Sequence, residues 1–264
     1  MLECVVVVYV LRYLRIVAYT VLFCTPLLVW SALDRSGDPT VRVARRWARS
    51  LLRTTGVKVR VEGLAFCSTD RPGVLMSNHR SVFDILALIE TLPTPFRFVA
   101  KKELTYIPIF GWALALSGQI IVDRGDRSRA IGALQRAAAK IRGGTKVLVF
   151  PEGTRGEDQE MLPFKSGGFH LAPANEWPIL PVAIIGSEKI TPKGSLRVEP
   201  GEILLVFGEP IATAGRSELT VSALKSEVRE EVAALIARRE TNWPHLAAGE
   251  WVRSRSSSPV ARDG

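Results

Sequence analysis

The spacing of apolar residues changes after Gly56 and divides the chain into a helical part and a mixed part. Short runs rich in Val, Ile and Leu predict strands over residues 57–61, 74–77, 96–100, 119–123, 146–150, 179–185 and 203–207. Apolar residues three to four apart predict helices over 128–142 and 220–239. Strands alternating with helical stretches predict an α/β fold with a mixed, largely parallel central sheet flanked by helices.

The N-terminus is the most apolar part of the chain. Residues 2–11 would form a helix of about 15 Å, too short for a hydrocarbon core of about 30 Å. Arg12 and Arg15 follow, and then residues 16–33 carry no charge, about 27 Å as a helix, with Pro26 inside. We expect a membrane-embedded helical hairpin in one leaflet rather than a full span. A signal peptide and a buried core helix are the alternatives.

Composition predicts four segments. Residues 1–39 form the membrane-embedded helical segment, 40–56 a basic amphipathic helix, 57–245 the α/β domain and 246–264 a Ser- and Arg-rich disordered tail. The basic helix has five arginines and no acidic residue: Arg42, Arg45, Arg46, Arg49 and Arg53. Following an apolar segment, it is expected to lie on the anionic headgroups of a phospholipid membrane, although a solvated basic face has the same pattern.

The net charge of +9 fits nucleic acid, an anionic membrane or an acidic substrate. No zinc spacing and no basic strand with interleaved aromatic residues is present, so we expect no nucleic-acid partner. The three cysteines form no C-x-x-C pair, which favours a reducing compartment. With three histidines and no His/Cys cluster, no metal site is expected.

Candidate chemistry begins where the strand at 74–77 ends. Asn78 is predicted to be a helix N-cap, with His79 in the first turn and Asp84 about one and a half turns on. A carboxylate on one imidazole nitrogen fixes the tautomer and leaves the other nitrogen as a base. The spacing alone is weak evidence, because His245 and Glu250 share it.

Two further strands end in polar residues, and ligand sites in open α/β sheets lie beyond the carboxyl ends of the strands. Arg124 follows one strand, while Gly153 and Arg155 follow another. Arginine binds phosphate bidentately, and glycine lets backbone N–H groups approach an anion. If the strands are parallel neighbours, His79 lies beside a phosphate site. The bland alternatives are an ion pair of Arg124 with Asp126 and a simple loop at 150–155.

Taken together, these stretches resemble the glycerolipid acyltransferase family of the 1-acyl-sn-glycerol-3-phosphate acyltransferase type. The matching motifs are residues 78–84 (NHRSVFD, like N-H-x-x-x-x-D), 118–124 (GQIIVDR), 150–155 (FPEGTR) and 177–182 (WPILPV), with 101–104 (KKEL) like the family's K-x-E-L. Ile121 stands where the family commonly has an aromatic residue, and Trp177 where it commonly has an aliphatic one.

The resemblance implies a mechanism that agrees with the residues. His79 would remove a proton from an acceptor hydroxyl, and Asp84 would orient His79 and stabilise its cation. The hydroxyl oxygen would attack the thioester of acyl-CoA or acyl carrier protein directly. No cofactor other than this co-substrate is implied. Lys102, Arg124 and Arg155 would bind the acceptor phosphate. The residues that would shape the acceptor site are Glu152, Gly153 and Thr154.

The implied activity is transfer of a fatty acyl chain to lysophosphatidic acid, giving phosphatidic acid, at the cytoplasmic face of the inner or cell membrane. Glycerol-3-phosphate and lyso-ornithine lipid are alternative acceptors. A membrane-associated thioesterase or lipase would use the same base with water, but needs no phosphate-binding arginines. A non-catalytic lipid-binding protein is the third class, and an intact His79–Asp84 pair argues against it.

Overall fold

The computed structural model describes the chain with short gaps and without its last segment. The described residues are 2–33, 38–68, 70–123, 125, 127–141, 143–156, 161–195, 197–215 and 221–240. The predicted tail at 246–264 and Arg124 therefore lie outside the described residues.

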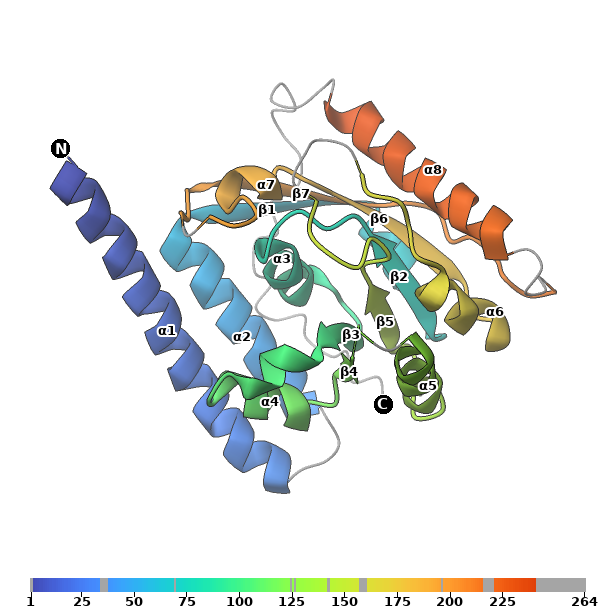
Figure 1. Ribbon diagram of the computed structural model, residues 1–264, viewed down its shortest axis with the longest axis horizontal. Coiled ribbons are helices and arrows are strands. Elements are labelled where there is room, and N and C mark those ends of the chain that lie inside the picture. The colour runs from blue at the N-terminus through green and yellow to red at the C-terminus, as the bar shows by residue number, and fades with distance from the viewer. Residues whose placement is uncertain are drawn as a thin grey trace, which may run out of the picture.

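A seven-stranded sheet forms the centre of the molecule (Figure 1). Its strands are β1 (Val57–Glu62), β2 (Gly73–Ser77), β3 (Phe96–Lys101), β4 (Ile120–Val122), β5 (Lys146–Val149), β6 (Ile179–Ile185) and β7 (Gly201–Phe207). The order is β1-β7-β6-β2-β5-β3-β4. Strands β6, β2, β5, β3 and β4 are parallel, β7 runs antiparallel to β6, and β1 is parallel to β7. The predicted mixed, largely parallel sheet is confirmed.

Helices cover both faces of the sheet, which explains why the central strands read as continuous apolar runs. The helices are α1 (Leu2–Leu33), α2 (Asp38–Thr55), α3 (Phe83–Thr91), α4 (Phe110–Leu116), α5 (Arg127–Ala138), α6 (Leu171–Ala174), α7 (Ser187–Ile190) and α8 (Val221–Glu240), with 3₁₀ turns η1 (Leu64–Cys67), η2 (Lys102–Tyr106) and η3 (Ser166–His170). Helices α2 and α3 pack on one face, and α5, α6 and α8 on the other (Figure 1).

Helix α1 is one continuous helix of 32 residues that runs alongside α2, and it contains Pro26. A hairpin within residues 1–39 is therefore not confirmed. Within the part of the chain that the structure describes, one stretch, Val8–Leu28, is long and apolar enough to cross a membrane by length and composition. Its outward side chains, among them Leu14 and Leu22, are exposed. These features indicate association with a membrane.

Helix α2 is amphipathic, as its sequence predicts, but part of its basic face contacts other residues of the same chain. Arg49 makes an ion pair with Glu90 of α3 at 3.0 Å, and Arg45 donates to the carbonyl of Leu92. On the opposite face, Leu51 is buried against the sheet. Contact of the remaining arginines with headgroups stays a prediction.

Candidate active site

The loop between β2 and α3 is built differently from the prediction. Helix α3 begins at Phe83, so Asn78 is not its N-cap and His79 is not in its first turn; that prediction is wrong. The buried Asn78 amide instead donates to the carbonyl of Ile184 and accepts from its N–H, both at 2.8 Å. A buried amide that satisfies two backbone groups of β6 gains more than a helix cap offers, and it fixes where the loop leaves the sheet.

Asp84, in the first turn of α3, reaches back to the loop that precedes the helix. Its side chain is fully buried, and Oδ2 accepts from Arg80 N–H at 2.7 Å and from Ser81 N–H at 2.9 Å. The same oxygen lies 2.7 Å from Nδ1 of His79. The structure thus brings the predicted pair together, and two backbone donors hold the carboxylate in place.

The imidazole of His79 is oriented on two sides. Its Nδ1 binds Asp84, and its ring stacks on Phe150 at the end of β5, with centroids 4.0 Å apart and planes 20° from parallel. Among the described residues no group is hydrogen-bonded to Nε2, and the side chain is 13% exposed. Because Nδ1–H donates to the carboxylate, Nε2 carries the lone pair and could act as a base.

Glu152 braces this loop from the neighbouring strand. Oε1 accepts from the backbone N–H of His79 at 2.7 Å, and Oε2 accepts from that of Leu162 at 2.8 Å. Burial raises the pKa of Glu152 above its ordinary value, while these two hydrogen bonds and the charges of Arg80 and His79 act against the rise. Glu152 therefore holds the backbone of His79, whereas the sequence predicted a role in shaping the acceptor site.

The side chain of Lys165 reaches the turn formed by residues 151–154. This basic residue was not found from the sequence. Gly153 has a φ of +74°, and a Cβ placed on it would lie 2.9 Å from Nζ of Lys165. The backbone N–H of Lys165 donates to the carbonyl of Pro151 at 2.8 Å. Among the described residues, neither Lys165 nor Arg155 forms an ion pair, and Thr154 beside them is exposed. Gly153 thus leaves the space that the Lys165 side chain fills.

Of the two remaining predicted phosphate ligands, the structure describes Lys102. Lys102 follows β3, and its Nζ lies 3.9 Å from the Asp123 carboxylate at the end of β4. Strand β5 separates β3 from β2, so Lys102 is not next to His79 along the sheet. Because Arg124 lies outside the described residues, its role in phosphate binding stays a prediction.

A mainly apolar cavity of about 510 Å³ lies between the sheet and helices α1, α2, α3 and α4. Its wall includes Val82 and Phe83, three and four residues after His79. Helix α1 contributes Ile16 and Thr20. The volume lies within the usual range for small-molecule sites, about 300–1,000 Å³. A long apolar group could therefore enter beside the His79 loop.

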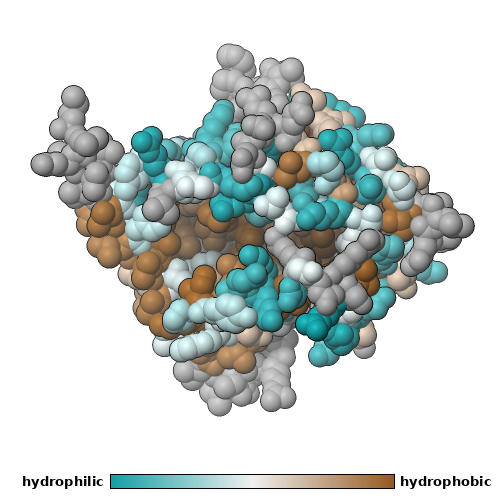
Figure 2. Space-filling model, viewed as in Figure 1, coloured by the Kyte–Doolittle hydropathy of each residue, from teal (hydrophilic) through white to brown (hydrophobic). Residues whose placement is uncertain are grey.

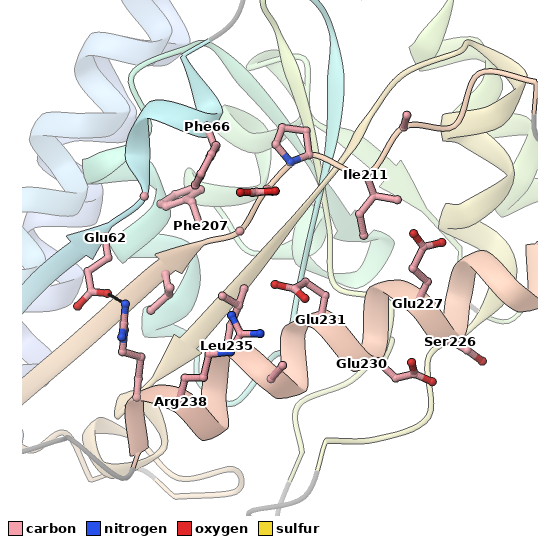
Figure 3. Close-up of a pocket in the computed structure, with 18 of the residues that line it drawn as sticks. Glu62, Phe66, Phe207, Ile211, Ser226, Glu227, Glu230, Glu231, Leu235 and Arg238 are labelled. Atoms are coloured by element: carbon pink, nitrogen blue, oxygen red, sulfur yellow. Dashed lines mark ion pairs between the residues drawn. The ribbon is translucent and has the colours of Figure 1, made fainter.

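A second hollow of about 1310 Å³ lies between α8 and the ends of β1 and β7 (Figure 3). It is the opposite edge of the sheet from His79, because β1 and β7 run against the other strands. Its acidic residues are Glu62, Glu209, Glu227, Glu230 and Glu231. This excess of carboxylates repels phosphate, so the hollow does not suit the acceptor headgroup.

Comparison with known proteins supports what the site indicates. The family model described as "Acyltransferase" matches residues 58–185. The mouse 1-acyl-sn-glycerol-3-phosphate acyltransferase alpha is 32% identical over 209 residues, which are 78% of this chain and 73% of that protein. The chloroplastic enzyme of the same name from Brassica napus is 31% identical over 192 residues, 72% of this chain. The chain spans only 55% of the length of that plant relative.

Similarity extends to the whole fold. The crystal structure of the 1-acyl-sn-glycerophosphate (LPA) acyltransferase PlsC from Thermotoga maritima matches with a TM-score of 0.76 and 28% sequence identity. The match covers 90% of this chain and 97% of that one, so it includes the sheet and the helices around the cavity. This chain therefore belongs to the acyltransferase family that contains the 1-acyl-sn-glycerol-3-phosphate acyltransferases.

Proposed function

We propose that this protein transfers a fatty acyl chain from acyl-CoA or acyl carrier protein to the free hydroxyl of lysophosphatidic acid, forming phosphatidic acid. The observation that carries the proposal is the oriented imidazole: Nδ1 of His79 lies 2.7 Å from Asp84 and Nε2 has no partner among the described residues. The names of the relatives supply the substrate class.

The chemistry needs one proton to move twice. Nε2 of His79 accepts the acceptor's hydroxyl proton as the hydroxyl oxygen attacks the thioester carbonyl. The Asp84 carboxylate stabilises the imidazolium that forms. When the tetrahedral intermediate collapses, the C–S bond breaks and the imidazolium returns the proton to the departing thiolate. A free thiol and an ester result, and no Ser or Cys nucleophile takes part.

The acceptor phosphate is assigned to the basic residues around residues 151–154, which we call the P-E-G-T turn. Arg155 follows this turn in the sequence, and the side chain of Lys165 reaches it at Gly153, so both cations would face an anion bound there. Lys102 and Arg124, at the ends of β3 and β4, would extend the same positive edge. Charge-assisted hydrogen bonds from such groups are about twice as strong as neutral ones.

The apolar cavity is assigned to the acyl chain of the thioester. It adjoins Val82 and Phe83, so a chain inside it would hold its carbonyl near His79. Helix α1 forms one wall of the cavity and exposes apolar side chains on its other side. We assign the molecule to the cytoplasmic face of the membrane, where α1 lies in one leaflet and the thioester arrives from water.

An acceptor panel with one acyl-CoA tests the proposal. The purified full-length protein should transfer acyl groups to lysophosphatidic acid more efficiently than to glycerol-3-phosphate, lyso-ornithine lipid or water. His79→Ala should abolish transfer while circular dichroism shows an unchanged fold. Thioester hydrolysis that is independent of any acceptor would make the protein a thioesterase instead. A folded His79→Ala protein with near-normal turnover would refute the mechanism.

A further inference from the structure

The exposed large apolar side chains are not scattered over the molecule. Among the described residues they lie on helix α1 and on residues 106–116, apart from Phe66 and Val82. In the second segment they are Tyr106 (67% exposed), Ile107 (46%), Trp112 (56%) and Leu116 (54%). Monomeric soluble proteins rarely expose contiguous apolar patches of large side chains. This patch therefore marks a surface that meets an apolar partner.

Helix α4 presents this patch because its inner face is already occupied. Ala113 packs against Cys24 and Leu27 of α1, which joins the two helices into one unit. Trp112 and Leu116 are four residues apart and so share one outward face of α4. Residues 104–122 carry no charged side chain. Lys101, Lys102 and Glu103 precede them, and Lys101 makes an ion pair with Glu103 at 3.1 Å.

We propose that residues 106–116 form a second membrane-docking element, in which Tyr106, Trp112 and Leu116 enter the headgroup region of the leaflet that holds α1. Helix α4, with seven residues, is about 10 Å long and cannot span a bilayer, but it can lie in the interface. Tyr and Trp are the side chains that favour this depth.

Continuity with α1 favours lipid over a protein partner. Hydrophobic surface runs along the α1 side of the molecule and continues beside it over α4 (Figure 2). Helices α1 and α4 lie next to each other (Figure 1), so a bilayer that receives α1 also reaches α4. A protein bound to α4 would have to displace the lipid around α1.

Residues 106–116 also border the apolar cavity that is assigned to the acyl chain. Ile107, Ile109 and Leu114 line the cavity wall, while Trp112 and Leu116 on the same segment do not. One segment therefore has a lipid-facing side and a cavity-facing side. The docked segment places this part of the cavity wall at the bilayer surface, so an acyl chain can reach it without crossing water. This inference goes beyond the proposed acyl transfer, and its first test does not depend on that activity.

The first test locates the segment in the membrane with α1 intact. Full-length Trp112→Cys in a Cys4→Ser background is labelled with an environment-sensitive fluorophore and bound to phosphatidylcholine–phosphatidylglycerol vesicles. Phe66→Cys, an exposed apolar position on η1 beside the acidic hollow, is the matched control. We expect lipids with bromine near the headgroup to quench the label at 112 but not the label at 66. Equal quenching of both labels by aqueous iodide, with none by brominated lipid, overturns the proposal.

The second test asks what the docking does. Trp112→Ser and Leu116→Ser should each lower turnover of vesicle-borne lysophosphatidic acid by about tenfold, since each removes much of one buried apolar side chain from the interface. Turnover of a short-chain, water-soluble acceptor should be unchanged, and Phe66→Ser should affect neither. Equal losses on both acceptors would show a structural role and contradict the proposal, as would no loss. If the wild type transfers to no acceptor, the proposed function fails while the quenching result still stands.

Discussion

Replacing Asp84 by Asn changes the charge beside His79 while keeping the shape of the site. Oδ2 of Asp84 accepts from Nδ1 of His79 and from the N–H groups of Arg80 and Ser81, whereas Oδ1 is buried without a partner among the described residues. An Asn side chain at this position has two orientations. Only the one with its oxygen in the place of Oδ2 satisfies all three donors, because the other would turn NH₂ toward them.

This orientation sets the expected loss of activity. In Ser-His-Asp triads the same change lowers kcat by about 10⁴, because the amide enforces the wrong imidazole tautomer. Here the donors from Arg80 and Ser81 keep the oxygen facing His79, so the tautomer is retained and only the charge is lost. We expect kcat to fall by about 10² to 10³, or roughly 2.7–4 kcal/mol.

The variant should also lose stability. The atom in place of Oδ1 has no partner in either protein, so the loss comes from Oδ2, whose hydrogen bonds from His79, Arg80 and Ser81 are no longer made to a charged oxygen. Hydrogen bonds to neutral groups are weaker, and we expect a total loss of about 1–3 kcal/mol. At about 2–4 °C per kcal/mol, the melting temperature should fall by roughly 2–12 °C. The assay is single-acceptor transfer in detergent, well below the melting temperature of the variant. Glu90→Gln, which removes a carboxylate that pairs with Arg49, is the matched control.

Two results would refute this reasoning. A folded Asp84→Asn protein with kcat close to that of the wild type would show that the carboxylate charge does not stabilise the imidazolium. A loss of 10⁴ or more would show that the backbone donors of Arg80 and Ser81 do not hold the amide orientation. Unchanged stability would show that the charge on Oδ2 does not strengthen its hydrogen bonds in the folded protein.

Four other substitutions test the surroundings of the base. Arg155→Ala and Lys165→Ala should each raise the KM for lysophosphatidic acid by about 10- to 100-fold and leave the donor KM unchanged, because each removes a charged hydrogen bond. Lys140→Ala is the control, since this exposed lysine precedes β5 whereas Arg155 follows it. A rise in donor KM alone would contradict the assignment. Burial raises the pKa of Glu152 above 4.5, so its contribution to stability is present at low pH and is lost as pH rises through the folded-state pKa. Denaturant unfolding should therefore show the advantage of the wild type over Glu152→Gln shrinking from pH 4 upward, and a pH-independent difference would contradict the shift. Ala44→Leu should narrow the cavity and shift the preferred donor toward shorter acyl chains in a chain-length panel; an unchanged preference would place the acyl chain elsewhere.

The strands were predictable because each is a local apolar pattern, and in β2, β5 and β6 every residue is buried. The sheet order was not, because β1 and β7 lie at one end and run against the other strands through contacts far apart in the sequence. The continuous α1 helix also differs from the expected break. Pro26 removes one helical hydrogen bond, yet α1 continues through it. On the same turn of α1, Cys24 and Leu27 pack against Ala113 of α4.

Within the site, sequence spacing succeeded where the partners are close in the chain. His79 and Asp84 are five residues apart and meet, although by a different local structure from the predicted one. Asn78 was misassigned because N-cap preference is local, whereas its true partner, Ile184, is 106 residues away. Lys165 was missed for the same reason, since it reaches the P-E-G-T turn from twelve residues downstream of Gly153. Gly153 was the signal that the sequence offered, because a glycine has no side chain and leaves room for a group from elsewhere in the chain.

Helix α1 has a role in both acyl binding and membrane contact in the proposed reaction. Ile16 and Thr20 line the cavity, whereas Leu14 and Leu22 are exposed, so in the proposed reaction the same helix would border the acyl chain and the lipid. Exposing an acyl chain to water costs about 0.8 kcal/mol per CH₂, so a route along this helix is favoured over one through solvent. Deleting residues 1–39 would remove the membrane contact and a cavity wall together, and only point changes on the outward face can separate the two. Anchoring and acyl binding are therefore properties of one structural unit rather than of separate domains.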